Sequence, residues 1–310
     1  MGHSRASERR DDADSGPHRP SRRDRGPYQR VGTAARRVGG ETLNFPRITL
    51  SETVETEGKA LHGGGPSRVR IHPGEDGIAF RTASGRTPAR PENVTDTTRS
   101  TRLGDVGTIE HLMSALAGLG VTDAEIEVEG GELPGLDGSA APWCALLRQA
   151  GLVTFAHGEL PPLFRRLFLQ EENIKIAVAK GNGHWRYEYY GEDRWPGEMF
   201  YESTDAVAEY EQEIAPSRTF ALSEQVPQLL QLGLGLGLDE TSCLVLGPDG
   251  YFNPARFPDE PARHKLLDLI GDLYLSGVPI GMLSVVAERS GHRAHVQAAK
   301  MLADALGSPG

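Results

Sequence analysis

Polar and apolar positions alternate with a regular period along most of the chain after residue 45, and this pattern predicts two successive groups of strands and helices. In the first group, alternating segments bounded by glycine and proline predict strands at 46–58, 67–74, 77–82 and 124–130. Leucine and methionine at helical spacing predict helices at 108–120 and 141–151. Together these elements predict an α+β unit.

A second group begins near residue 161 and repeats the order of strands followed by helices. Alternation predicts strands at 163–183, 184–193 and 280–291, and helical spacing predicts helices at 222–233, 260–277 and 295–307. We place the N-cap of the first of these helices at Ser223 and its end at Gly233. The sequence therefore predicts an α+β fold of two domains, 46–160 and 161–307, each with a β-sheet layered with helices. The repeated order suggests a duplicated architecture.

The helix predicted at 260–277 carries three polar residues at a spacing of four, His264, Asp268 and Asp272. Residues four apart lie on one face of a helix. Apolar residues cover most of the remaining surface, so this polar face should be partly buried, where carboxylates need partners. Two interpretations stay open on this helix alone: a functional site, or an exposed His-Asp pair supported by Lys265.

A second polar pair, Glu110 and His111, begins the helix at 108–120. Polar residues are common at helix starts, because the first turn has free N–H groups and a partial positive charge. The alternative interpretation is that Glu110 and His111 belong to a catalytic metal site. His111, His264 and Asp268 would give three ligands to a zinc ion and leave one position for water, and Glu110 beside them could act as a general base.

Two further side chains could complete such a site. Asp272 lies one turn beyond Asp268, where it could orient another group. The candidate for that group is His292, in the sequence SGHRAH after a predicted strand. As a protonated imidazole, His292 could stabilise an oxyanion or protonate a leaving amine.

The composition is that of a globular protein, with 310 residues, 38% hydrophobic and 25% charged. The longest uncharged apolar run, 229–238, has ten residues, well below the ~18 that indicate a membrane span. The first residues lack the apolar stretch of a secretory signal, so we expect a cytoplasmic protein without a transmembrane segment. Cys144 and Cys243 are far apart and lack metal-ligand spacing, so neither a disulfide framework nor a cysteine zinc site is expected.

Charge divides the chain unevenly. Residues 1–40 contain ten arginines and five acidic residues, a balance of +5, so the net charge of −10 leaves −15 for residues 41–310. The acidic body argues against nucleic-acid binding by the folded part. We predict that residues 1–45 are a disordered, Arg-rich tail, because they hold too few large apolar side chains to offset chain entropy. The tail is either an arm for RNA or anionic membranes, or an idle or tethering segment.

Six separated motifs resemble, in order and spacing, those of one enzyme family. They are EGKALHGGG, GTIEHLMSALAGLG, LPGLDGSAAPW, PSRTF, FPDEPARHKLLDLIGDLYLSG and SGH. The family is UDP-3-O-acyl-N-acetylglucosamine deacetylase, a zinc amidohydrolase of lipid A biosynthesis, and the resemblance covers about residues 46–307. It implies two α+β domains whose helices pack against each other between the sheets, with zinc at the seam.

The resemblance also implies a role for each candidate residue. It makes His111, His264 and Asp268 the zinc ligands, Glu110 the general base, and His292, held by Asp272, the cationic general acid. Thr219 would donate a hydrogen bond to the tetrahedral oxyanion. Lys265 would meet the nucleotide diphosphate, Phe220 would contact the sugar, and His62 would lie near the substrate. We expect a monomer that acts on an acylated UDP-amino sugar.

The Gly-rich run LGLGLGLD at 232–239 corresponds to the insert that receives the fatty acyl chain in the family, and its alternative is a packed strand and turn. Three stretches depart from the family pattern: GEDRWPGEMF, GLGLDET and a shortened loop before GTIEH. All three would surround the acyl and sugar pockets. Two other functions therefore stay open, a divergent deacetylase of another N-acetylated amino sugar or nucleotide sugar, and a non-catalytic regulator that keeps zinc for stability.

Overall fold

The first five-stranded sheet is formed by strands from the N-terminal half of the chain, in the computed structural model that describes residues 42–162, 166–191 and 194–307. Its strands, in the order β2-β3-β8-β4-β5, are Val54–Lys59, Pro66–Pro73, Ala124–Glu129, Ile78–Thr82 and Gly85–Pro88. Only β4 and β8 run parallel. Along β3, Val69 and Ile71 face the core while Arg68 and Arg70 face outward, which is the alternation that the sequence predicts.

The second five-stranded sheet is formed by strands from the C-terminal half and has the same strand order. Its strands, in the order β10-β11-β16-β12-β13, are Leu167–Glu171, Ile174–Lys180, Leu283–Glu288, His184–Tyr190 and Glu198–Ser203. The last strand in sequence again lies in the middle, parallel to the third strand and antiparallel to the second. The two halves therefore share one topology, as the duplicated order of elements suggests.

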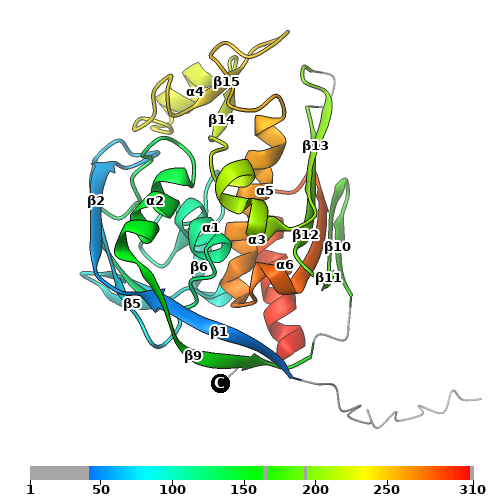
Figure 1. Ribbon diagram of the computed structural model, residues 1–310. Coiled ribbons are helices and arrows are strands. Elements are labelled where there is room, and N and C mark those ends of the chain that lie inside the picture. The colour runs from blue at the N-terminus through cyan, green and yellow to red at the C-terminus, as the bar shows by residue number, and fades with distance from the viewer. Residues whose placement is uncertain (1–41, 163–165, 192–193, 308–310) are drawn as a thin grey trace, which may run out of the picture. The chain divides into compact units, whose positions relative to one another are not determined.

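Helices lie between the two sheets, as the fold prediction requires, except for a short helix at 226–231, which lies at the top of the view outside this layer (Figure 1). The helices are α1 (Glu110–Gly118), α2 (Ala141–Ala150), α3 (Ala206–Glu209), α4 (Val226–Gln231), α5 (Glu260–Leu273) and α6 (His292–Leu306). Helix α1 packs against α5, α2 contacts β2 and α1, and α5 and α6 contact strands of the second sheet. The α+β prediction is confirmed, with the apolar faces of both sheets covered by these helices.

Shorter elements connect these layers. Strands β1 (Leu43–Leu50) and β9 (Leu152–Leu160) pair with each other, as do β6 (Val94–Asp96) with β7 (Arg102–Leu103) and β14 (Phe220–Leu222) with β15 (Leu244–Leu246). Strand β1 begins at Leu43, inside the segment predicted as tail, and residues 1–41 lie outside the described residues. The domain boundaries 46–160 and 161–307 stay a prediction.

Each segment predicted as a helix or strand contains an element of that kind, but many bounds differ. The segments 46–58 and 163–183 each contain two strands instead of one, and the prediction misses β5, β6, β7, β9, β13, β14 and β15. Helix α6 begins at His292 with Gly291 as N-cap, so His292 is the first helical residue instead of lying before the helix predicted at 295–307. Helix α4 has Gln225 as N-cap instead of Ser223. Residues 163–165 and 192–193, in two predicted strand segments, lie outside the described residues. None of the helices in the described part of the chain has the length and apolar character that a bilayer crossing needs.

Candidate functional site

The first turn of α1 is pressed against the middle of α5. A Cβ atom on Gly271 would lie 2.1 Å from the carbonyl oxygen of Glu110, so only glycine allows the two helices to approach this closely. This contact brings Glu110 and His111 from α1 beside the polar face of α5. Two segments that are some 150 residues apart therefore meet, as the predicted site requires.

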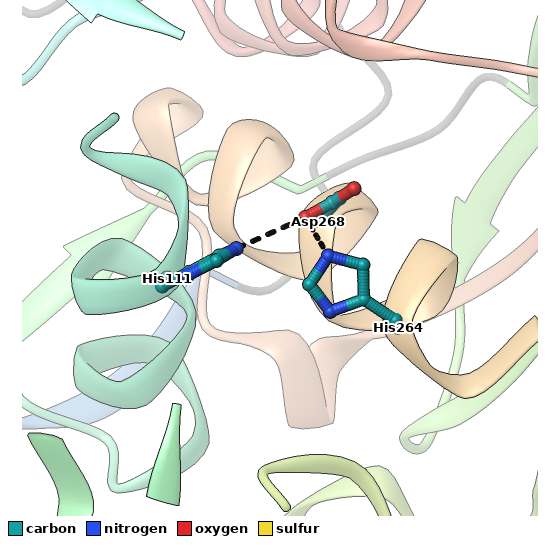
Figure 2. Close-up of side chains that lie close together, drawn as sticks. All are labelled: His111, His264 and Asp268. Atoms are coloured by element: carbon teal, nitrogen blue, oxygen red, sulfur yellow. Dashed lines mark ion pairs between the residues drawn. The ribbon is translucent and has the colours of Figure 1, made fainter. Parts of the chain in front are cut away.

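His111, His264 and Asp268 form one buried cluster at this contact. Figure 2 shows His111 of α1 and His264 of α5 directed toward the Asp268 carboxylate. Asp268 Oδ1 lies 3.7 Å from His111 Nε2 and 3.4 Å from His264 Nε2. One donor atom from each of the three residues lies within 4.8 Å of the others, and all three side chains are buried. An exposed His-Asp pair on α5, the open alternative, is therefore wrong.

The donor atoms of this cluster fit a divalent cation. His264 Nδ1 donates to the carbonyl oxygen of Ser217 at 3.1 Å, so a neutral His264 directs the lone pair of Nε2 toward Asp268. Burial, reinforced by the neighbouring His264, lowers the pKa of His111 to about 3, so that imidazole is neutral as well. Asp268 Oδ1 is buried and has no hydrogen-bond partner among the described residues. Lone pairs that converge on an unpartnered carboxylate oxygen suit a metal such as zinc.

The second oxygen of Asp268 has a cationic partner. Lys265 Nζ donates to Asp268 Oδ2 at 2.8 Å, and Nζ also lies 5.6 Å from the centre of the Phe220 ring. Burial opposes ionisation of Asp268, but the charge of Lys265 outweighs it and lowers the pKa of the carboxyl. Asp268 is therefore an anion with one oxygen bound to Lys265 and the other free for a cation.

Glu110 and His292 lie beside this cluster and have pKa values shifted upward. Burial raises the pKa of Glu110 to about 8, against the opposing charge of His292. Burial lowers the pKa of His292, but Asp272, which accepts from His292 Nδ1 at 2.9 Å, outweighs it and the value rises to about 9. A carboxylate with a raised pKa is a stronger proton acceptor, and a charged imidazole is a proton donor, so the pair suits acid-base chemistry.

A cavity of about 770 Å³ opens onto these side chains. Every predicted site residue except Asp272, which lies behind His292, contributes to its lining. The polar end of the lining contains His62, Glu110, His111, Thr219, Phe220, His264, Lys265, Asp268 and His292. The apolar part contains Leu222, Val226, Leu229, Leu230, Leu234 and Leu238, from α4 and its surroundings. The cavity therefore joins a polar, ionisable end to an apolar chamber.

The Gly-rich run forms part of the wall of the apolar chamber. Residues 232–239 form turns and no strand, so the strand alternative is wrong. The run packs on the loop around His62: Leu236 N–H donates to the carbonyl oxygen of His62, and Gly237 N–H donates to that of Leu61. A Cβ on Gly237 would lie 2.1 Å from the carbonyl oxygen of Ala60, which explains the need for glycine there. His62 Nδ1 accepts a hydrogen bond from Gly235 N–H at 3.3 Å.

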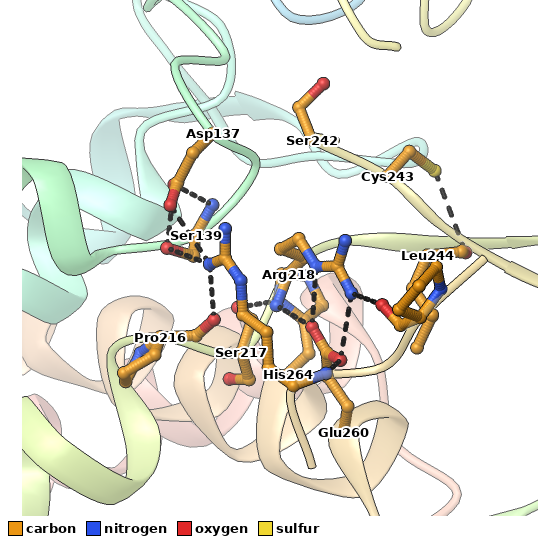
Figure 3. A network of polar contacts seen from close by, with 12 residues as sticks. Asp137, Ser139, Pro216, Ser217, Arg218, Ser242, Cys243, Leu244, Glu260 and His264 are labelled. Atoms are coloured by element: carbon orange, nitrogen blue, oxygen red, sulfur yellow. Dashed lines mark hydrogen bonds and ion pairs between the residues drawn. The ribbon is translucent and has the colours of Figure 1, made fainter. Parts of the chain in front are cut away.

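A buried ion pair fixes the segment that carries Thr219 and Phe220 (Figure 3). Arg218 Nε and the Arg218 backbone N–H each donate to Glu260 Oε1 at 2.9 Å, and both side chains are buried. Glu260 lies in the first turn of α5, so this pair joins the segment 216–219 to the helix that carries the metal cluster. It also holds Ser217, whose carbonyl oxygen orients His264.

Breaking this pair should destabilise the protein strongly. Arg218→Met leaves the Glu260 carboxylate buried without its counter-ion, which typically costs about 3–5 kcal/mol. In the double variant Arg218→Met/Glu260→Gln the unpaired charge is gone, and the amide oxygen can still accept from the backbone N–H of residue 218, while the N–H of residue 256, which binds the other oxygen of Glu260, loses its acceptor. Urea denaturation at pH 7 should therefore find the double variant more stable than Arg218→Met. Equal stabilities, or an Arg218→Met variant as stable as the parent, would show that the pair is not a structural anchor.

The sequence interpretation missed four residues that support the site. They are Thr101, Arg218, Glu260 and His295. Arg218 and Glu260 lie within the PSRTF and EPARH stretches, but an acidic residue at a helix start is common and does not by itself indicate a buried charge. Thr101 and His295 carry no recognisable spacing signal.

Comparison with known proteins gives one consistent family. Residues 47–304 match the model of the LpxC family, UDP-3-O-acyl N-acetylglycosamine deacetylase. The chain is 35% identical over 282 residues to the UDP-3-O-acyl-N-acetylglucosamine deacetylase of Trichormus variabilis, covering 82% of this chain and 97% of that protein. It is 34% identical over 263 residues to the protein of the same name from Aquifex aeolicus, covering 82% and 92%. A third relative of that name, from Anaeromyxobacter dehalogenans, is 34% identical over 256 residues, covering 79% and 83%.

Proposed function

The chain belongs to the UDP-3-O-acyl N-acetylglycosamine deacetylase family, and we propose that it hydrolyses the N-acetyl group of UDP-3-O-acyl-N-acetylglucosamine in a zinc-dependent reaction of lipid A biosynthesis. The observation that carries the proposal is the convergence of the buried His111, His264 and Asp268 cluster with Glu110 and His292 at one end of an apolar cavity. The products are acetate and a free 2-amino sugar. A metal held for stability alone would require neither Glu110 nor His292 beside the ligands.

In this proposal His111, His264 and Asp268 hold the zinc ion, each with the donor atom that faces the cluster. Bound zinc supplies Lewis-acid chemistry: it polarises a carbonyl group and makes water a better nucleophile near neutral pH. Lys265 binds the second oxygen of Asp268 and so fixes which oxygen faces the metal. The carbonyl oxygen of Ser217 does the same for the ring of His264.

Two side chains divide the proton transfers. Glu110 accepts a proton on its carboxylate as water adds to the amide carbonyl carbon. His292 has Nδ1 bound to Asp272, which leaves Nε2 to give a proton to the amide nitrogen as the C–N bond breaks. The charge on His292 is stabilised by Asp272, and the acceptor strength of Glu110 comes from burial. Each proton therefore has a stated donor or acceptor on the protein.

The remaining residues bind the substrate. Thr219 donates its hydroxyl to the oxygen that becomes negative when water adds. The backbone of Thr219 is held on both sides, since its N–H donates to Gly138 and its carbonyl oxygen accepts from Leu244. Lys265 meets the diphosphate, Phe220 contacts the sugar, and His62 lies near the substrate beside the Gly-rich wall. The apolar chamber receives the acyl chain, and the protein acts as a monomer.

Acetate release from defined substrates tests the proposal. The purified protein should release acetate from UDP-3-O-acyl-N-acetylglucosamine, and far more slowly from UDP-N-acetylglucosamine, which has no acyl chain to fill the apolar chamber. Equal rates on the two substrates would instead indicate a divergent deacetylase of another amino sugar. No acetate from either substrate, by a protein that contains zinc, would overturn the proposal and favour the regulator.

A further inference from the structure

Thr101 lies fully buried between the two elements that carry the proton-transfer groups. Its backbone N–H donates to Glu110 Oε2 at 3.0 Å, and its hydroxyl Oγ1 lies 2.6 Å from Asp272 Oδ1. Its carbonyl oxygen accepts from the N–H of Ile109, the residue before α1, at 3.1 Å. The N–H, the carbonyl oxygen and the hydroxyl of Thr101 therefore all form hydrogen bonds, two with the start of α1 and one with α5.

The direction of each hydrogen bond follows from the chemistry of the groups. An ionised carboxylate has no proton to give, so the Thr101 hydroxyl donates to Asp272. The other oxygen of Asp272, Oδ2, accepts from Nδ1 of His292 at 2.9 Å and from Nδ1 of His295 at 3.0 Å. Asp272 therefore has three side-chain donors, and their directions leave the carboxylate a single orientation.

His295 is the second anchor of this carboxylate. It is fully buried, one turn after His292 on α6, and it does not line the cavity. Because His295 Nδ1 carries the proton donated to Asp272, a neutral ring leaves Nε2 to accept from the hydroxyl of Ser290, 2.9 Å away. His295 thus has both nitrogens hydrogen-bonded inside the protein and binds Oδ2 of Asp272, whereas Thr101 binds Oδ1.

We propose that Thr101 is a positioning residue that fixes the proton acceptor Glu110 and the proton donor His292 relative to each other, through its amide on Glu110 and its hydroxyl on Asp272. The inference rests on the proposed function, since it concerns the groups that transfer protons there. Glu110 comes from α1 and Asp272 from α5, and Thr101 is bonded to both. A small rotation of Asp272 would turn the ring of His292 and displace Nε2 from the leaving nitrogen, and misplacement by about 1 Å can cost about 100-fold in rate.

Two substitutions of Thr101 distinguish the effect of its hydroxyl group from the effect of its side-chain volume. Thr101→Val keeps the volume and the backbone bond to Glu110 but removes the donor to Asp272. Thr101→Ser keeps the donor and removes only a methyl group. We expect Thr101→Val to lower kcat by about 10–100-fold, the usual range for a group that orients a functional side chain, with KM changed less than about twofold. Thr101→Ser should restore kcat to within about threefold of the parent.

Thr49→Val is the matched control. Thr49 of β1 is also buried, and its hydroxyl accepts from the N–H of Gly74, the residue after β3, at 2.8 Å; Thr49 does not line the cavity. This variant makes the same chemical change and should lose stability while kcat stays at the parent value. A Thr101→Val variant with unchanged kcat, or a Thr101→Ser variant as impaired as Thr101→Val, would overturn the inference, the second result because it would point to packing of the methyl group.

A spectroscopic measurement tests the hydrogen-bonded connection from Thr101 through Asp272 to His292 and does not depend on enzymatic activity. Imidazole N–H protons bound to a carboxylate give low-field proton NMR signals, and His295→Asn identifies the signal of residue 295 in the spectrum of the ¹⁵N-histidine-labelled protein. Thr101→Val should shift the signals of both His292 and His295, because both protons bind the oxygen next to the one that loses its donor. Unchanged signals would overturn the linkage. A parent protein that shows these shifts on substitution but releases no acetate would instead overturn the proposed function.

Discussion

Replacing Glu110 by glutamine should lower kcat by at least ~100-fold while the protein keeps its metal and its fold. Glutamine has the shape of glutamate, and its amide oxygen can still accept from Thr101 N–H, so the buried hydrogen bond is retained. What is lost is the ability to take a proton from water. Because burial makes Glu110 a stronger proton acceptor than an exposed carboxylate, no neighbouring group of similar acceptor strength replaces it readily.

The controls for this variant are metal content and a matched exposed glutamate. Glu129→Gln makes the same chemical change at an exposed position of β8 and should leave kcat unchanged. Metal analysis of Glu110→Gln should find the same zinc content per chain as in the parent. Turnover within about threefold of the parent would exclude Glu110 as the general base. A loss of turnover that matches a loss of zinc would assign Glu110 to metal binding instead.

The second large effect is expected from Gly271→Ala. In an ordinary helix this change stabilises by about 1 kcal/mol, because alanine has the higher helix propensity. Here the new Cβ would lie 2.1 Å from the carbonyl oxygen of Glu110, so α1 has to move away from α5. Overpacking of this kind typically costs about 1–3 kcal/mol, so the sign of the stability change should reverse. The movement also carries Glu110 and His111 away from His264 and Asp268, and turnover and zinc content should both fall.

Denaturation, turnover and zinc content measured together check this prediction. Gly250→Ala serves as the control, since a Cβ there meets nothing within 4 Å and the backbone has an ordinary φ. That variant should match the parent in all three measurements. If Gly271→Ala were as stable as the parent and kept its zinc and turnover, the close contact between α1 and α5 would not be what positions the two halves of the site.

Within the described residues, the sequence predicts the longer helices and the inner strands of both sheets, misses strands such as β5, β9 and β13, and does not predict the order of the strands. Periodicity identifies α1 and α5 because their apolar positions repeat over two or more turns. The beginning of α6 at His292 was missed, since its first turn, HRAH, has no apolar pattern and Gly291 is an unremarkable cap. The central position of β8 and β16 in their sheets depends on packing between distant segments, which local periodicity does not encode.

Some residues of the candidate site can likewise be identified from local sequence, and others cannot. The spacing of four along α5 places His264, Asp268 and Asp272 on one face from the sequence alone, and the structure buries all three. Placing His111 at that face was one of two open interpretations of the helix start, and only the family resemblance favoured it, because nothing local to residues 107–120 indicates which helix they meet. Thr101 could not be predicted, since it is 171 positions from its partner Asp272 and a threonine before a short strand is an ordinary residue.

The central claim is that His111 of α1 and His264 and Asp268 of α5 share one zinc ion. Anomalous X-ray scattering, recorded on either side of the zinc absorption edge from crystals of the protein purified without added chelator, tests this claim most directly. We predict a single strong peak in contact with His111 Nε2, His264 Nε2 and Asp268 Oδ1. A peak bound elsewhere, or crystals of active enzyme with no peak at these three atoms, would contradict it.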